Sequence, residues 1–464
     1  MILNIDPAGV AGFTAEDRYW FGKLLQVFDS HWSSNYEKER YYEGKISLGS
    51  VNLGIALPDG MKGLEIGCAW GAKCVDVLAA RSMFDGFVGA DGEDVEELDR
   101  LVLNNNLVAE YLKAARDELK FGCTFATLSR DPAIGCKIRF HSPRTAAAIW
   151  DGDKGRIACG FAVIDTAPDN ASPLNWQPFL LNYYTPREVI VLSRSGQSWT
   201  STRFPHRMGR PLMEPLIWNA TSNKPFGRSR IKEPVRRLIQ GYVRTIADAT
   251  IGLEFATSPQ KYLLGVTDAQ YDALINQKFK QYVGNIIAST TNPETGEKPS
   301  FGQLPQGNIG PHVEMVRVLA TQFSAATCLP VTDTGVVNDA NPSSSDAIEA
   351  QTKSLVGLAQ DLNTGNGSSL RTIALMALAI SNNTTIEALS DEQKAIVAHF
   401  KNPAMPSVAV TADAAIKIAS SRPAFADTDT FLEMIGFSKA DIRRIKAQEQ
   451  RARGQAVLEE LGIE

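Results

Sequence analysis

The sequence has few histidines and no long apolar run. Its 5 histidines do not pair at the spacing of metal ligands, so a histidine-rich metal site is not expected. The longest uninterrupted apolar runs, such as 373–380, are far shorter than the roughly 18 to 20 residues that cross a bilayer. The N-terminus also lacks the basic stretch and apolar run of a signal peptide. We therefore expect no membrane contact.

Cysteine usage gives no sign of a disulfide or zinc framework. The 6 cysteines form no C-x-x-C pair. Cys68 and Cys74 are six residues apart, which places them on different faces of a helix, roughly 240° from each other. We expect reduced thiols, as in a cytosol.

The common catalytic signatures are also missing. The sequence has no G-x-x-x-x-G-K-[ST], no G-x-G-x-x-G after a strand, no H-E-x-x-H and no G-x-S-x-G. His312 and Glu314 form an H-x-E, but no P-C-x-x-C follows to supply zinc ligands. We expect no catalytic residue, cofactor or metal. A soluble enzyme with an unmarked pair of carboxylates stays an alternative, because such pairs converge in space rather than along the chain.

Neither positive nor negative side chains are in large excess. Lys and Arg total 47 against 52 Asp and Glu, which gives a formal net charge of -5. No global positive field exists to drive tight non-specific binding to nucleic acid, so any contact with DNA must be local or weak.

What the chain does contain is a large apolar fraction and a mixed texture. At 464 residues and 44% hydrophobic content it exceeds the size of one core, which favours several packed regions. Short runs rich in Val, Ile, Phe and Tyr separated by turn residues predict an antiparallel meander over 121–219. Helical patterns precede and follow it, so the fold class is α+β. The helices are expected near 14–43, 66–80, 102–119, 233–251, 268–287 and 312–327.

The helix expected from His312 is apolar over more than half its circumference. Its polar positions fall within about 80° of one another when plotted at 100° per residue. Such a helix needs neighbours on several sides. Gly and Pro supply 8 of the 23 residues in 289–311, so we expect this segment to be one long connection between this helix and 268–287.

The last third of the chain alternates helices and polar breaks. The segment 331–342 is polar and poor in large apolar side chains, so we expect it to be exposed. A helix should run from Ser343 to about Leu362, and the Gly- and Asn-rich stretch 363–369 should kink or break it before 370–380. The tail from about Ser390 reads as helical with short linkers.

Several short segments then appear in a distinctive order. They are Tyr41–Gly44, Trp70, Val75–Arg81, Gly86–Phe87, Gly209–Pro215, Phe226–Ile231, Ser258–Gly265, Pro311–Met315 and Asn341–Ala347. In order and spacing the chain resembles the portal proteins of tailed bacteriophages, in particular the siphophage family and its actinobacteriophage-like branch. No single segment is diagnostic, and together they cover nearly the whole chain. The family's long wing helix is generally continuous and basic-rich, and the stretch 363–369 departs from it.

The resemblance implies a portal fold with a β-rich and helical wing, a two-helix stem, a small clip, a long wing helix and a helical crown. The implied boundaries are 1–264 for the wing, 265–288 for the first stem helix, 289–311 for the clip, 312–330 for the second stem helix, 331–342 for the tunnel loop, 343–389 for the long wing helix region and 390–464 for the crown.

The resemblance also implies a function and a set of partners. The chain would form a homo-oligomeric ring, usually of twelve copies, at one capsid vertex of the virion, after assembly in the host cytoplasm. Double-stranded DNA would pass through its channel with weak contact during packaging and ejection. The ring would bind the major capsid protein, the terminase large subunit and a head-tail adaptor, the last two at the clip. The nearest alternative is another connector ring of the head-tail joint.

Two sets of residues would carry these roles. The tunnel loop would present Thr332, Asp333, Thr334, Asn338, Asp339 and Asn341 to the channel. The stem would pack through Val313, Val316, Leu319 and Phe323.

Overall fold

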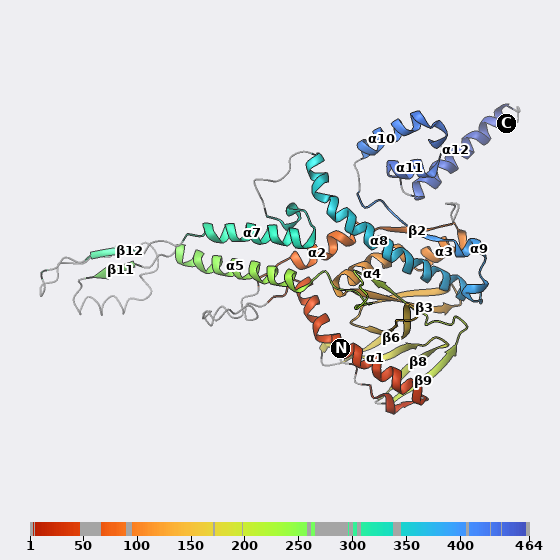
Figure 1. Ribbon diagram of the computed structural model, residues 1–464, viewed down its shortest axis with the longest axis horizontal. Helices are drawn as coiled ribbons and strands as arrows, with labels where there is room; N and C mark the ends of the chain where they lie inside the picture. The colour runs from red at the N-terminus through yellow and green to blue at the C-terminus, as the bar shows by residue number, and fades with distance from the viewer. Residues whose placement is uncertain are drawn as a thin grey trace.

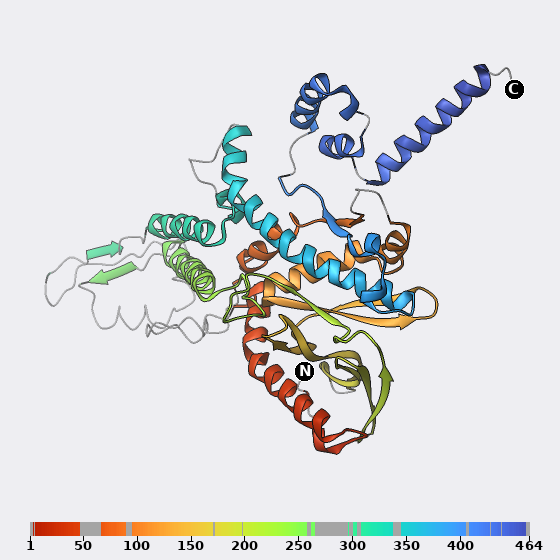
Figure 2. The same cartoon turned by 45° about the vertical axis from the view of Figure 1, so that its right-hand side comes forward.

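The protein is described by a computed structural model. It describes residues 3, 5–46, 66–89, 95–169, 172–196, 198–257, 261–264, 296, 300–303, 308–336, 345–404, 408–426, 428–437 and 439–460. The fold is α+β, as the sequence predicts, with a mixed body from which two helices project (Figures 1 and 2).

The helices lie on both sides of the β-rich segment in the sequence. They are α1 (Ala15–Tyr42), α2 (Trp70–Ala79), α3 (Glu96–Asn104), α4 (Leu107–Phe121), α5 (Glu233–Thr257), α7 (Gly310–Thr327), α8 (Ser345–Ser381), α9 (Asp391–Lys394), α10 (Val408–Ser421), α11 (Asp429–Ile435) and α12 (Lys439–Glu460). Short 3-10 turns cover Pro7–Gly9, Val331–Thr334, Ile386–Ala388 and Pro423–Phe425.

The strands of the described residues form four sheets. They are β1 (Val10–Ala11), β2 (Phe84–Val88), β3 (Cys123–Asp131), β4 (Gly135–His141), β5 (Ala146–Asp151), β6 (Arg156–Asp169), β7 (Ser172–Tyr184), β8 (Glu188–Ser195), β9 (Ser198–Pro205), β10 (Met213–Ile217), β11 (Lys261–Leu264), β12 (Ser300–Gln303) and β13 (Val397–Phe400). The largest has the order β1-β9-β8-β7-β6-β5, and the second has the order β10-β3-β4. The meander predicted over 121–219 is confirmed, divided between these two sheets.

Helix α1 covers one face of the large sheet. A capping box starts it, because Thr14 accepts a hydrogen bond from the Asp17 backbone and Asp17 accepts one from the Thr14 backbone. Its apolar stripe, which includes Phe21 and Phe28, packs on Phe161, with ring centroids 5.8 and 5.5 Å apart. This layer forms one of three buried clusters in the body.

Helix α8 runs without interruption over 37 residues, so the helix does not break at 363–369, where the sequence predicts a kink or break. Intrinsic helix propensity there is poor, since the stretch holds two glycines and two asparagines. Its small and polar side chains pack against the body and bond there instead. Ser369 Oγ, for example, donates to the Pro215 carbonyl at 2.8 Å.

The sequence predicts a tail of helices and short linkers, but the structure also has a strand there. β13 lies inside the segment 390–464 and pairs antiparallel with β2. Phe400 then packs edge-on against Phe84 and Tyr111, with ring centroids 5.9 and 5.8 Å apart. Part of the expected crown is therefore a strand that closes the core of the body.

Within the described residues, no helix is both long and apolar enough to span a membrane.

Candidate functional site

The helices α5 and α7 form a pair, called here the projecting pair, that leaves the body at one end (Figures 1 and 2). The segment between them carries β11 and β12, which pair antiparallel at the far end. The sequence reading placed α5 within the wing and expected the partner of α7 at 265–288, which lies outside the described residues. Most of the expected clip, 289–311, also lies outside them.

The base of the projecting pair is tightly packed. Leu319 and Phe323 of α7 are buried against Val243 and neighbouring apolar residues of α5. A Cβ atom added at Gly241 would lie 3.3 Å from Leu319 Cδ2, so this glycine allows the two helices to approach closely. Trp70 of α2 stacks on Phe323 with ring centroids 4.8 Å apart. The pair is therefore anchored in the body by large side chains.

Arg230 ties the end of α7 to the body. Its Nε donates to the Cys74 carbonyl at 2.5 Å, and its Nη2 donates to the Thr327 carbonyl at 2.6 Å. The guanidinium also lies 5.9 Å from the centroid of the Trp218 ring. Burial lowers the pKa of this guanidinium, and within the described residues no carboxylate forms an ion pair with it. One side chain thus connects α2, α7 and the segment before α5.

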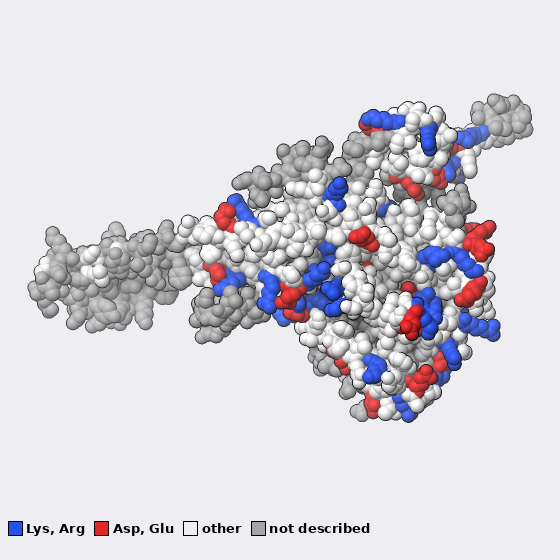
Figure 3. Space-filling view, viewed as in Figure 1, with Lys and Arg blue, Asp and Glu red and all other residues white. Residues whose placement is uncertain are grey.

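The outer half of the projecting pair is apolar and exposed. Val313, Met315 and Val318 of α7 are 49%, 48% and 48% exposed, and Leu253 of α5 is 47% exposed. We call these four residues the apolar patch. The Glu314–Arg317 ion pair of α7, at 3.0 Å, and the Arg244–Asp248 ion pair of α5, at 3.6 Å, lie on the same two helices, and Figure 3 shows charged side chains among the uncharged surface of the pair. At 100° per residue Val313 and Met315 lie about 160° apart around α7, so these side chains lie around the helix rather than on one face. Exposed apolar side chains on more than one side suit a helix that contacts several neighbours.

The four residues predicted to pack the stem lie in different environments within one chain, and their role in a stem stays a prediction. Leu319 and Phe323 are buried and Val316 is half-buried, whereas Val313 is exposed within one chain. Whether Val313 packs in an assembly stays a prediction.

The expected tunnel loop is only partly described. Val331–Thr334 is a 3-10 turn in which Thr332 is exposed and Asp333 is half-buried. Thr334 is buried, contrary to the expectation of an exposed side chain, because its hydroxyl donates to the Val331 carbonyl and its own carbonyl accepts from Trp70 Nε1 at 3.1 Å. The positions Asn338, Asp339 and Asn341 lie outside the described residues.

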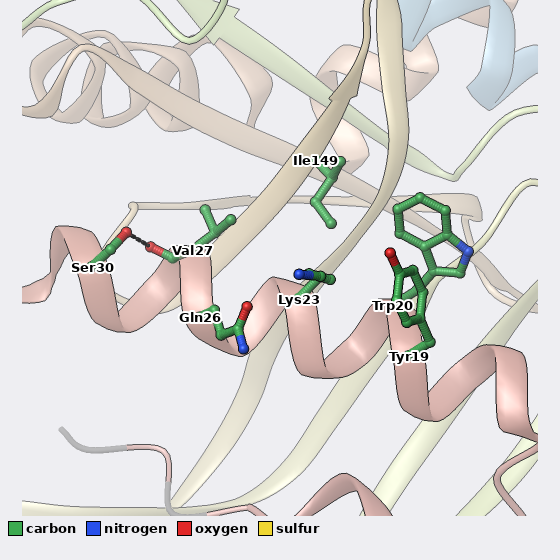
Figure 4. A pocket seen from close by; sticks show the side chains of 7 residues that line it. All are labelled: Tyr19, Trp20, Lys23, Gln26, Val27, Ser30 and Ile149. Carbon is green, nitrogen blue, oxygen red and sulfur yellow. Dashed lines mark hydrogen bonds between the residues drawn. The ribbon is translucent and has the colours of Figure 1, made fainter.

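A shallow hollow of about 370 Å³ lies on the outer side of α1 (Figure 4). Its lining consists of Tyr19, Trp20, Lys23, Gln26, Val27, Ser30 and Ile149. It contains no carboxylate, histidine or cysteine, so it offers no acid-base pair or nucleophile. Among the described residues, no group of three histidine, cysteine, aspartate or glutamate side chains is placed to hold a metal ion.

Two features of this site could not be found from the sequence. Arg230 stands in a basic stretch, 224–237, that reads as a solvated surface, and nothing in its spacing separates the buried arginine from exposed neighbours such as Arg237. Leu253 belongs to a helix that the sequence reading assigned to the wing. The position of Arg230 depends on its contacts with α2 and α7, and that of Leu253 on the pairing of α5 with α7, and neither contact is local in sequence.

Comparison with known proteins gives structural matches only. No family model matches the sequence, and no curated protein matches it. Solved structures that are similar include "Virion of native gene transfer agent (GTA) particle", at 12% identity and a TM-score of 0.45 over 79% of this chain and 89% of that one. Another is "Neck of empty GTA particle computed with C6 symmetry", at 13% identity and a TM-score of 0.44 over 81% of this chain and 89% of that one. A third is "Neck of native GTA particle computed with C12 symmetry", at 11% identity and a TM-score of 0.43 over 79% of this chain and 89% of that one. Likeness at these identities and TM-scores does not assign a family.

Proposed function

We propose that this chain is a portal subunit of a tailed-phage particle, which assembles into a closed ring and forms the channel for DNA at one capsid vertex. The observation that carries the proposal is the projecting pair, anchored at its base and apolar on its outer half. A monomer would leave the apolar patch in water. Identical chains that meet head to tail cover such a patch in every copy when the rotation closes.

The finer assignment rests on the order of short segments in the sequence, which resembles the siphophage portal family and its actinobacteriophage-like branch. On that basis the ring would have about twelve copies, would carry DNA during packaging and ejection, and would bind terminase, a head-tail adaptor and the major capsid protein. It would have no catalytic activity of its own.

The ring is tested by replacing apolar residues on the outer half of α7. Val313→Asp and Val318→Asp should each leave the fold intact, because both side chains are about half exposed in one chain. Both should reduce assembly, because an aspartate in the contact would be desolvated without a partner. Leu103→Asp is the matched control, since Leu103 is 77% exposed on α3, away from the pair.

Light scattering and negative-stain imaging provide the measurements. The wild type and the Leu103 variant should give annular particles with a mass near twelve subunits, and the α7 variants should give smaller species. A stable monomer of the wild type at micromolar concentration would contradict the proposal. A small compact oligomer with enzymatic turnover would favour the enzyme alternative.

The turn after α7 is proposed to face the channel. Thr332 is exposed and Asp333 is half-buried, so an acidic or neutral tip would approach DNA without binding its phosphates tightly. Asp333→Lys in assembled rings should strengthen DNA retention, and the gain should disappear at high salt. Unchanged retention would remove this turn from the channel wall.

A further inference from the structure

A carboxyl group is enclosed in the middle of the body. Glu118 on α4 and Asn366 on α8 are both 0% exposed. Asn366 Nδ2 donates to Glu118 Oε2 at 2.8 Å and to the Tyr111 hydroxyl at 3.0 Å. The two helices are thus joined through one amide, in the stretch where the sequence predicts a break in α8.

Two acceptor atoms in this cluster have no partner. Glu118 Oε1 and Asn366 Oδ1 are both buried and form no hydrogen bond. If Glu118 is ionised, both atoms can only accept, and neither can satisfy the other. Buried acceptors without donors are costly. A proton on Glu118 removes the conflict, because it changes one acceptor into a donor.

The surroundings of Glu118 favour its neutral form. Burial raises the pKa of its carboxyl to about 8, and the hydrogen bond from Asn366 only partly opposes this. The titratable groups that face it are Tyr111 on α4 and Cys123 on β3, and burial raises the pKa of both. Within the described residues, no lysine, arginine or histidine forms an ion pair with Glu118.

We propose that Glu118 is a neutral acid at pH 7, that its proton on Oε1 is donated to Asn366 Oδ1, and that this acid-amide pair is a proton-dependent clamp on the middle of α8. The clamp lies in a part of α8 that other side chains also hold. Neighbouring bonds hold the same stretch, since Ser82 Oγ donates to Asn363 Oδ1 and contacts the Tyr111 hydroxyl, each at 2.6 Å.

Deprotonation sends the proton to solvent and leaves a buried carboxylate facing a carbonyl oxygen. The middle turn of α8 then has glycines and asparagines but weaker side-chain bonds to hold it helical. The parts of α8 on either side, 345–362 and 370–381, would move more independently. This regulation of α8 does not depend on the proposed ring.

Infrared spectroscopy tests the protonation state directly. The wild-type protein should show the carbonyl stretch of a buried protonated carboxyl at pH 7, and the band should fade as the pH rises through about 8. Burial also raises the pKa of Glu214, to about 7, so a second buried carboxyl contributes to this region of the spectrum. Glu118→Gln should remove the component that fades near pH 8, whereas Glu110→Gln, the same change at a half-buried position of α4, should keep it. If Glu118→Gln fails to fold, Asn366→Ala assigns this component instead, because losing its amide partner should shift the frequency. Absence of this component at pH 7 in the wild type would overturn the proposal.

Hydrogen exchange tests the clamp on α8. The carboxyl has its ordinary pKa when the helix opens and a raised pKa when it is closed, so stability of the closed form falls as the pH rises between them. The opening constant of amides in 360–372, corrected for intrinsic exchange, should rise roughly tenfold per unit between pH 5 and 8. Glu118→Gln should flatten this slope and Glu110→Gln should not. Equal slopes in all three proteins would refute the clamp.

Discussion

At the scale of single residues, Arg230 decides how the projecting pair meets the body. Its two carbonyl partners differ in kind. The Cys74 carbonyl lies within α2, whereas the Thr327 carbonyl lies at the last turn of α7, where backbone acceptors have no helical donor. The buried charge costs desolvation energy, and the guanidinium recovers it by filling an otherwise empty acceptor site and by contact with Trp218.

Replacing Arg230 should therefore give an order of stabilities that charge alone does not predict. Arg230→Met removes the desolvation cost but leaves the Thr327 carbonyl without its donor, so we expect a loss of about 1 to 2 kcal/mol. Arg230→Lys keeps a buried charge and loses the planar fork that reaches both carbonyls, so we expect a loss of about 3 kcal/mol. Denaturant unfolding measures both. A lysine variant as stable as the wild type would show that the fork geometry is unimportant.

A second residue gives the protein an acid limit. Burial, with a smaller contribution from Arg139, lowers the pKa of His141 to about 4, and its Nε2 lies 3.0 Å from Thr127 Oγ1. The unfolded chain binds a proton near the ordinary histidine pKa and the folded chain does not. His141 therefore contributes stability above about pH 6.5 that is lost as the pH falls to about 4.

The sign is opposite to that of Glu118, whose contribution grows on acidification. Denaturation midpoints measured from pH 7 to 4 should thus fall less steeply in His141→Gln than in the wild type. His312→Gln, on α7, controls for the loss of a histidine elsewhere. Parallel curves for the wild type and His141→Gln would assign the acid limit to other groups.

At the scale of elements, the sequence predicts α1, the meander and α7 well, because each has a clear period and clear end signals. The single helix expected near 102–119 is wrong, since α3 ends at Asn104 and α4 begins at Leu107, with Asn106 in the left-handed region between them.

The sequence prediction also fails for α8. Local propensity at 363–369 is poor, and what overrides it is contact with residues more than a hundred positions away, such as Tyr111 and Pro215. In the candidate site, the burial of Leu319 and Phe323 follows from the period of α7, whereas the contact of α7 with α5 does not follow from any local pattern.

Glycine substitutions test whether α8 is continuous. A Cβ at Gly367 would lie 3.6 Å from Phe400 and one at Gly365 would lie 3.9 Å from the Ile217 carbonyl, so both positions have room for alanine. Gly365→Ala and Gly367→Ala should each stabilise the protein by about 0.5 to 1 kcal/mol, because alanine favours the helix. Thermal unfolding checks this.

The control lies on α2. A Cβ at Gly71 would lie 2.0 Å from the Tyr41 carbonyl oxygen, so Gly71→Ala should destabilise the protein strongly. Destabilisation by either α8 alanine would argue that this stretch departs from helical geometry in solution.

At the scale of the whole molecule, segments from the two ends of the chain meet in the body, and local sequence patterns do not predict such a contact. Residues 397–400 return to pair with β2, far away in sequence. The short run Val397–Phe400 is too brief to distinguish from a linker by periodicity. The helices α10 to α12 then follow as a separate group in Figure 1, with His399 Nε2 3.6 Å from Glu433 Oε2 of α11 as one link.

Truncations at two places test where the body ends. A chain stopped after Ala404 keeps β13, the Phe400 contacts, and the bond from Arg81 to the Pro403 carbonyl at 2.9 Å. We expect it to fold, with a denaturation midpoint close to that of the full chain.

A chain stopped after Ala395 lacks only a few more residues, yet it exposes the edge of β2 and removes Phe400 from Phe84 and Tyr111. Loss of the fully buried Ile396 costs about 2 to 5 kcal/mol, loss of the half-buried Phe400 adds to this, and an unpaired strand edge invites aggregation. We expect this shorter chain to be unstable or insoluble. Equal solubility and midpoints for the two truncations would mean that β13 is dispensable, and the body would then end before residue 396.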